Sequence, residues 1–418
     1  MKIVFALVLP ILAAACSSTG GQPAPDAGSD SNPQGDSGPG NAAWTAVATK
    51  DPAGAGIQVS GFWFESTTNG FVSFDEGYVE HFSSPTQIDK IALDGHGKAP
   101  NGQDDAYFGF LPNTSLGLVV RNQDASELVI STDKGATFNY VKSYAQTAKA
   151  PQTVSPDWPL IWLGSDPSSA WHMATLGGVG GDVWASPTAP SPTATLTDTW
   201  HPAGAITVPA TIPAADCNAW VVNSYYSSEP GWVFTATTDG KAMIYSSNDG
   251  ASGAICRSTD GGKNFVDVSA NISPTTFSSS NVPWSYLFTS PTVGIGFYGS
   301  DSSGPGSAYV LYTSDGGSSW TVGTLPTSAG PGVDLISAFA SPSGTMFIVG
   351  GTGAGPLLVY KSTDGGKTWT DISAKLQAFE NTVDNAPLRL TAGFALDDQN
   401  IWVGGEGGFV AYSSTGGQ

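Results

Sequence analysis

The sequence has little positive charge. It contains 15 Lys and Arg residues against 35 Asp and Glu residues, so its formal net charge at pH 7 is −20. Nucleic acids and anionic lipid surfaces are bound mainly through clusters of Lys and Arg, so we expect neither as a partner. A large negative charge also keeps a protein soluble, and this general role accounts for most of the acidity.

Cysteine and histidine are also scarce, and no group of them has the spacing of zinc ligands. The chain lacks a P-loop, a Gly-x-Gly-x-x-Gly segment in a βαβ setting and a Gly-x-Ser-x-Gly nucleophile elbow. We therefore expect no metal and no cofactor, and no residue stands out as catalytic. The scarce residues are Cys16, Cys217, Cys256, His81, His96, His172 and His201.

No long stretch has helical periodicity. The chain instead has 53 Gly and 29 Pro, and its short β-rich runs lie between Gly, Pro and Asp turns, which is typical of an all-β protein. One turn pattern recurs: Ser/Thr-x-Asp-x-Gly-x-x-Trp/Phe, which we call the repeat turn. It occupies 131–138, 258–265, 313–320 and 362–369.

Each position of the repeat turn has a local physical role. The short Asp side chain accepts hydrogen bonds from backbone N–H groups just ahead of it and closes the turn. The Gly permits positive φ, and the aromatic residue brings a large apolar surface to a packed layer. We therefore interpret the repeat turn as structural, although it carries an acid.

The spacing of the repeat turns predicts the architecture. Asp260, Asp315 and Asp364 follow one another at about 50 residues, a period typical of a propeller blade of four strands. The longer gap after Asp133 requires a degenerate copy near 188, and further copies fit near 85 and near 415. Seven units result. The last unit ends before a fourth strand, and 43–48, with Trp44 in the place of the aromatic residue, resembles that missing strand. We expect this segment to close the ring by covering the open sheet edges.

The repeat turns resemble the Asp-box (BNR) repeat of sialidase-like β-propellers, and the single-ring size is similar to that of photosystem-assembly-factor propellers. The resemblance implies a single seven-bladed β-propeller of four-stranded blades over 43–418. The residues that carry it are Ser131, Asp133, Gly135, Phe138, Ser258, Asp260, Gly262, Phe265, Thr313, Asp315, Gly317, Trp320, Ser362, Asp364, Gly366 and Trp369.

The first residues are typical of an export signal. Residues 1–15 combine one Lys with an apolar stretch that is interrupted by Pro10 and too short to span a bilayer. The small residues before Cys16 resemble a bacterial lipobox, which implies acylation of Cys16 and a lipid anchor. Ser17 resembles the residue found in lipoproteins sent to the outer membrane. The alternative is an ordinary secretory signal with an incidental cysteine.

Residues 17–42 are polar and contain almost no large apolar side chains, so we expect 16–42 to be a disordered tether. With Cys16 acylated, Cys217 and Cys256 remain as a pair. Outside the cytoplasm such a pair is typically a disulfide; the alternative is two buried thiols.

A ligand site is expected at one end of the blades. In a four-stranded meander, the loops before the first strand and after the second strand (D–A and B–C) emerge at one end, and the repeat turns lie at the other. Ligands of propellers mostly use the loop end near the channel. The candidate residues there are Arg121, Trp158, Trp220, Tyr225, Tyr226, Arg389 and Glu406.

These resemblances imply different functions. Sialidases hold a substrate carboxylate with three Arg, and this chain has three in total, of which Arg257 lies at the repeat-turn end. Sialidase activity is therefore not expected. Two-propeller xyloglucan hydrolases also carry such repeats, but they need a second propeller for their cleft, and we expect one propeller here. Assembly-factor propellers bind polypeptide through a basic patch, which so acidic a chain lacks. The sequence favours a binding or scaffold module for a protein or glycan; a glycoside hydrolase with paired carboxylates at the loop end is the alternative.

Overall fold

A computed structural model divides the chain into two units, 1–41 and 42–418, of which only the second contains residues that the structure describes. The predicted signal peptide, Cys16 and the tether lie outside the described residues. The described residues are 43–49, 58–74, 79–93, 106–110, 117–121, 127–131, 133–141, 159–162, 171–175, 182–186, 201–202, 217, 234–237, 241–248, 253–259, 265–273, 282–283, 285–299, 308–329, 332–352, 356–376 and 389–418.

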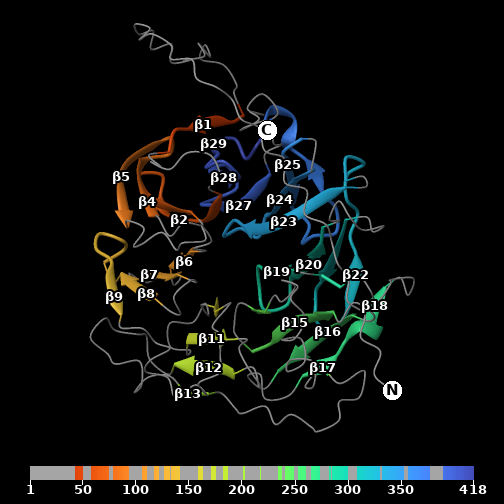
Figure 1. Cartoon of the computed structure of the whole chain (residues 1–418). Helices are drawn as coiled ribbons and strands as arrows, with labels where there is room; N and C mark the ends of the chain where they lie inside the picture. Colours follow the sequence, from red (N-terminus) through yellow and green to blue (C-terminus); the bar gives the residue numbers. More distant parts are fainter. Residues whose placement is uncertain are drawn as a thin grey trace, which may run out of the picture. The chain divides into compact units, whose positions relative to one another are not determined.

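The second unit is all-β, as predicted, and its described residues form seven sheets, numbered here in chain order (Figure 1). In each sheet the strands pair antiparallel, except that the extra strand of sheet 5 pairs in parallel. Sheets 1 to 4 are β2 (Val59–Ser66), β3 (Asn69–Phe74), β4 (Val79–Ser84) and β5 (Gln87–Leu93); β6 (Ala106–Phe110), β7 (Gly117–Arg121), β8 (Glu127–Ser131) and β9 (Asn139–Val141); β10 (Pro159–Trp162), β11 (Trp171–Thr175), β12 (Asp182–Ser186) and β13 (His201–Pro202); and β14 (Phe234–Ala236), β15 (Met243–Asn248), β16 (Gly253–Ser258) and β17 (Val266–Asp267).

Sheet 5 has a fifth strand, β18, which follows the short 3₁₀ helix η3 (Ser269–Asn271). A second 3₁₀ helix, η4 (Ser373–Lys375), follows sheet 6. Sheets 5 to 7 are β18 (Ile272–Ser273), β19 (Ser285–Phe288), β20 (Gly294–Tyr298), β21 (Tyr309–Thr313) and β22 (Trp320–Val322); β23 (Val333–Ala340), β24 (Met346–Thr352), β25 (Leu358–Ser362) and β26 (Thr370–Asp371); and β27 (Leu390–Ala395), β28 (Ile401–Gly405) and β29 (Val410–Ser413) with β1 (Thr45–Val47).

The amino-terminal strand completes the last sheet. β1 pairs antiparallel with β29, in a register that sets Thr45 opposite Tyr412 and Val47 opposite Val410 (Figure 1). This confirms the predicted closure by 43–48. Trp44 is 1% exposed, and its ring lies close to Gly417, where an added Cβ would come within 3.1 Å of it. The closing segment is thus fixed by strand pairing and by a buried aromatic anchor.

The core consists of apolar layers between consecutive sheets. Phe64 of sheet 1 stacks on Trp402 of sheet 7 with ring centroids 3.6 Å apart, and the Trp402 indole donates to the Pro85 carbonyl oxygen at 2.9 Å. Similar clusters join sheets 4 and 5, 5 and 6, and 6 and 7. These sheets therefore depend on their neighbours, because a single small sheet cannot bury both of its faces.

The chain also links sheets along their outer edges. After the last strand of sheet 4, the chain continues to Ile272 and Ser273, which pair in parallel with Trp320 and Thr321 of sheet 5. Thr324 bridges to Thr368 of sheet 6, and Ala48 bridges to Gln87 of sheet 1. These links cover part of each following outer strand and reduce the exposure of its edge.

The closure predicts a large effect of Trp44→Ala. Removing a buried Trp side chain from a packed site costs about 3–5 kcal/mol of unfolding free energy. Thr45→Ala is the matched control, because Thr45 directly follows Trp44 and has an exposed side chain, and an exposed substitution changes stability by about 0.5 kcal/mol or less. Denaturant unfolding of both variants measures the difference. Equal stability of the two variants would contradict the anchoring role of Trp44.

Candidate functional site

The repeat turns at 131–138, 313–320 and 362–369 share one set of hydrogen bonds. In the last of them, Ser362 Oγ donates to Asp364 Oδ1 at 2.9 Å and accepts from the Gly366 N–H at 3.0 Å. The Thr368 N–H donates to Asp364 Oδ1 at 3.0 Å, and the Thr368 hydroxyl donates to Asp364 Oδ2 at 2.6 Å. The equivalent bonds join Ser131, Asp133, Gly135 and Thr137 in the first turn, and Thr313, Asp315, Gly317 and Ser319 in the second.

Two other copies keep parts of this arrangement. In the turn at 258–265, Ser258 and Phe265 are buried, whereas Asp260 and Gly262 lie outside the described residues. Near the carboxyl end, Thr415 stands in the place of the Asp. There the Gly417 N–H still donates to Ser413 Oγ at 2.9 Å.

The glycine two residues after the Asp of each described turn packs against the preceding sheet. Gly317 has φ +80°, and an added Cβ would lie 2.4 Å from Ile244 of sheet 4; at Gly366 it would lie 2.3 Å from Ile295 of sheet 5. Gly135 has the same relation to Phe71 of sheet 1. Glycine is needed here both for positive φ and for the close approach. The repeat turns therefore also join neighbouring sheets, and we assign them a structural role.

The turn carboxylates are held in their ionised form. Burial raises the pKa of Asp364, but the hydrogen bonds from Thr368, Ser362 and the Lys367 backbone lower it by more, so the pKa lies below the ordinary value of an aspartate. The pKa values of Asp133 and Asp315 are lowered by equivalent bonds. A lowered pKa stabilises the fold above the ordinary pKa of Asp, and this contribution is lost as pH falls through the folded-state pKa.

The repeat turn predicts a graded series of stabilities. Ser362 is 2% exposed, so Ser362→Ala leaves the buried Gly366 N–H without its acceptor and costs about 1–3 kcal/mol. Asp364 is exposed, and water can replace it, so Asp364→Ala costs about 0.5–1.5 kcal/mol at pH 7. That cost shrinks as pH falls from the ordinary pKa of an aspartate through the lowered pKa of Asp364, where the folded wild-type carboxylate takes up a proton. Thermal unfolding checks this, with the exposed Lys367→Ala as control; a larger loss in the control would contradict it.

The opposite end of sheets 6 and 7 holds an ion cluster. Arg389, directly before β27, donates through Nη1 to Asp334 Oδ2 of β23 at 2.9 Å. Its Nε lies 3.5 Å from Glu406 Oε1, in the turn after β28. The Arg389 N–H also donates to Glu406 Oε2 at 3.0 Å. An isolated bridge between Glu406 and Gln58 links this turn to the residue before β2. Segments that belong to sheets 6, 7 and 1 therefore meet here.

Glycines on the neighbouring strands make room for this cluster. A Cβ at Gly351 would lie 3.1 Å from Arg389 Cγ, and a Cβ at Gly405 would lie 1.9 Å from the Arg389 carbonyl oxygen. The first strands of sheets 6 and 7 each have a register shift near the same end, between Leu335 and Ser337 and between Leu390 and Ala392. Such irregularities re-aim the chain at sheet ends and here bring Arg389 between two acids.

The two carboxylates of the cluster neutralise the charge of Arg389, which the sequence predicts as a ligand residue. Arg389 is 39% exposed at its side chain, Glu406 36% and Asp334 10%. Because the guanidinium already contacts two carboxylates, an anionic ligand would have to displace them. The cluster therefore does not act as a free carboxylate clamp. Arg257 serves another purpose, because its Nε donates to the Gly316 carbonyl oxygen at 2.7 Å in the repeat turn of the next sheet.

The other predicted ligand residues are only partly placed. Arg121 is the last residue of β7, at the expected end, and its side chain is not among those described. Trp158, Trp220, Tyr225 and Tyr226 lie outside the described residues. Three residues that the sequence did not single out, Asp334, Tyr298 and Tyr309, also lie at this end, and no local sequence signal marks any of them.

Tyr298 and Tyr309 form an aromatic pair at the loop end of sheet 5. They stand at the end of β20 and the start of β21, and their rings stack with centroids 5.5 Å apart. Burial, followed by the neighbouring hydroxyls of Tyr286 and Tyr298, raises the pKa of Tyr309 well above its ordinary value. The hydroxyl of Tyr309 therefore stays protonated at neutral pH.

Cys217 and Cys256 form a disulfide with a Cα–Cα distance of 5.7 Å. Cys256 lies on β16, so the bond ties the long connection that contains Cys217 to sheet 4. Among the residues described, no group of three His, Cys, Asp or Glu could hold a metal ion. In the same part of the chain, no helix is both long and apolar enough to cross a bilayer.

The fold defines the class of this protein as a β-propeller. No family model and no curated protein matches the chain. A solved structure of YCF48 bound to D1 peptide is similar, with a TM-score of 0.53 and 14% identity over 89% of this chain and 97% of that one. YCF48 from Cyanidioschyzon merolae is similar with a TM-score of 0.56 and 14% identity over 89% of this chain and 98% of that one. At this identity the likeness concerns the fold alone.

Proposed function

We propose that this protein is a lipid-anchored extracytoplasmic binding module, in which each of the seven sheets is one propeller blade and the loop end binds a protein or glycan. The observation that carries the proposal is the contrast between the two ends of the sheets. At one end, the described repeat turns 131–138, 313–320 and 362–369 bond their Asp carboxylates and the flanking Ser and Thr hydroxyls within the turn. The other end has the longer connections, the Arg389 cluster and the Tyr298–Tyr309 pair.

A polypeptide is the favoured ligand. Among the proteins of similar fold, YCF48 has been solved with a bound D1 peptide. The acidic chain and its neutralised Arg389 favour a ligand with neutral or cationic groups over an anionic one. The hydrolase alternative has less support, because the carboxylates of Asp334 and Glu406, the two acids described in this cluster, both contact Arg389.

The anchor is proposed from residues 1–16. Acylation of Cys16 after removal of 1–15 would attach the propeller through 16–42 to an outer membrane, because several acyl chains together give stable anchoring. In cells, Cys16→Ser should abolish incorporation of a clickable palmitate analogue and release the protein from the membrane fraction. Ser17→Ala is the control and should remain labelled. Labelled, membrane-bound Cys16→Ser protein would refute the anchor.

The binding face is tested with peptide and glycan arrays probed with the full chain in detergent. For each array hit, Arg389→Gln should weaken binding by about tenfold or more, because the cluster at the loop end is altered. Lys367→Gln, at the repeat-turn end, should leave it unchanged. Melting temperatures identify any variant that is merely unfolded. Binding that depends on Lys367 but not on Arg389 would contradict the proposed face, and hydrolysis of an arrayed glycan would favour the enzyme alternative.

A further inference from the structure

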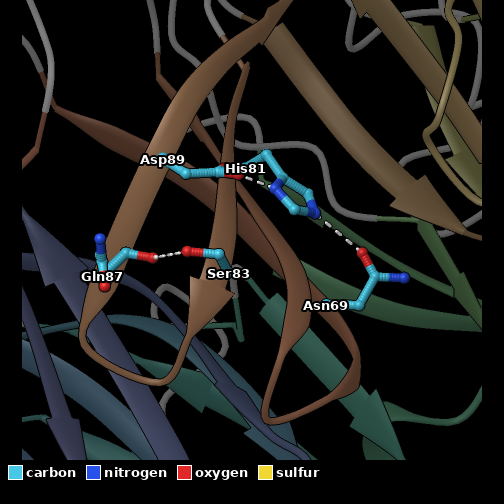
Figure 2. Close-up of polar contacts among 5 residues, drawn as sticks. All are labelled: Asn69, His81, Ser83, Gln87 and Asp89. Atoms are coloured by element: carbon cyan, nitrogen blue, oxygen red, sulfur yellow. Dashed lines mark hydrogen bonds and ion pairs between the residues drawn. The ribbon is translucent and has the colours of Figure 1, made fainter.

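A chain of polar side chains runs from sheet 1 to the repeat turn of sheet 2. His81 on β4 lies between Asp89 of β5 and Asn69 of β3 (Figure 2). Its Nδ1 is 2.7 Å from Asp89 Oδ1, and its Nε2 is 3.0 Å from Asn69 Oδ1. Asn69 Nδ2 donates to Glu65 Oε2 at 3.0 Å, and Lys134 Nζ donates to Glu65 Oε1. Lys134 belongs to the repeat turn 131–138, so this chain connects two sheets.

The bond to Glu65 fixes the orientation of the Asn69 amide. If the amide were reversed, its oxygen would face the Glu65 carboxylate, and two acceptors would be opposed. The amide oxygen therefore points to His81 Nε2, which has to donate a proton to it. The Asp89 carboxylate accepts from Nδ1. Both ring nitrogens of His81 thus face acceptors, and only the doubly protonated imidazolium carries an N–H on both.

The charges around His81 support this form. Burial raises the pKa of Asp89, but the hydrogen bond and charge of His81 lower it by more. The hydrogen bonds from Lys134 and Asn69 lower the pKa of Glu65. Both acids are therefore ionised at neutral pH. The cations that face the group are Lys134, paired with Glu65, and the exposed Lys90, which is opposite His81 in the strand register.

We propose that His81 is a proton-operated clamp: its doubly protonated form holds the repeat turn 131–138 against sheet 1, and loss of one proton to solvent releases that contact. With the Asp89 bond retained, the deprotonated Nε2 would oppose the Asn69 oxygen. Asn69 would then rotate and turn its oxygen toward Glu65, which weakens the link to Lys134. The contact is therefore closed while both ring nitrogens carry a proton, and it loosens as rising pH removes one of them.

The packing confines this effect to one turn. The His81 ring lies edge-on to Phe71 with centroids 5.0 Å apart, and Phe71 fills the space beside Gly135 of the same repeat turn. The repeat turn 362–369 has the same internal bonds and contacts no histidine among the described side chains. It is therefore an internal reference for the turn 131–138.

Amide hydrogen exchange of the full chain tests the clamp. The protection of 131–138 is measured relative to 362–369 between pH 5 and pH 8, so that the intrinsic pH dependence of exchange cancels. In the wild type, this ratio should fall by about fivefold as pH rises, which is the effect of one lost hydrogen bond of typical strength. His81→Gln and Lys134→Ala should each make the ratio independent of pH. Ser83→Ala, which removes only the weak bond to the Gln87 carbonyl oxygen (Figure 2), should behave as the wild type.

The ¹⁵N NMR signals of the imidazole rings test the clamp in the wild type, even if His81→Gln does not fold. The chain has 4 His, so selective ¹⁵N labelling gives few imidazole signals, and that of His81 is the one that disappears in His81→Asn or His81→Gln. Two N–H groups on His81 at pH 5.5, converting to one by pH 8, would support the clamp. A neutral His81 at pH 5.5, or a ratio of protection that does not change with pH in the wild type, would overturn it.

Discussion

A small sheet with two apolar faces is stable only when both faces are covered, and the rest of this structure depends on that constraint. Where side chains are described, neighbouring sheets pack on each other, as Phe64 packs on Trp402. The last sheet is completed by β1, which pairs with β29. The same constraint explains the glycines of the repeat turns, because Gly317 and Gly366 let a turn approach an apolar side chain of the preceding sheet. The turn pattern is thus a packing device as well as a turn.

The two ends of the sheets have different chemistry as a result. At the repeat-turn end, the Ser, Thr and Asp side chains of each described turn are committed to bonds within that turn, such as those of Ser362 and Asp364. At the loop end, the described ion cluster joins residues that are distant in sequence, such as Arg389 and Asp334. Local bonds stabilise the blades whatever the loops do. The loop end is therefore free to carry a binding function, which is the basis of the proposed function.

Much of the fold could be predicted from the sequence, because its determinants are local. The turn bonds and the strands depend on short segments in which each residue type has one main structural role. The same holds for the closing segment around Trp44. The hydroxyl residue before the aromatic residue was missed, although three of the four copies have one, as Thr137, Ser319 and Thr368. The pairing of β18 with the next sheet was also missed, because a two-residue strand leaves no periodic signal.

The candidate site was less predictable for a physical reason. Arg389 and Glu406 were expected at the loop end, but their neutralisation depends on Asp334, which comes from another sheet. Which strand ends meet across sheets is decided by packing of the whole molecule, and no residue pattern encodes it locally. The link from His81 to Lys134 has the same character, since four side chains from two sheets must meet to form it.

The central claim is that the two ends of the sheets divide structure from binding. A hydrogen-exchange footprint of a peptide or glycan bound to the full chain tests it most directly. The account predicts that the ligand slows exchange in 332–335, 389–390 and 405–409, at the loop end, and leaves 313–320 and 362–369 unchanged. Protection confined to those repeat turns, with none at the loop end, would contradict it.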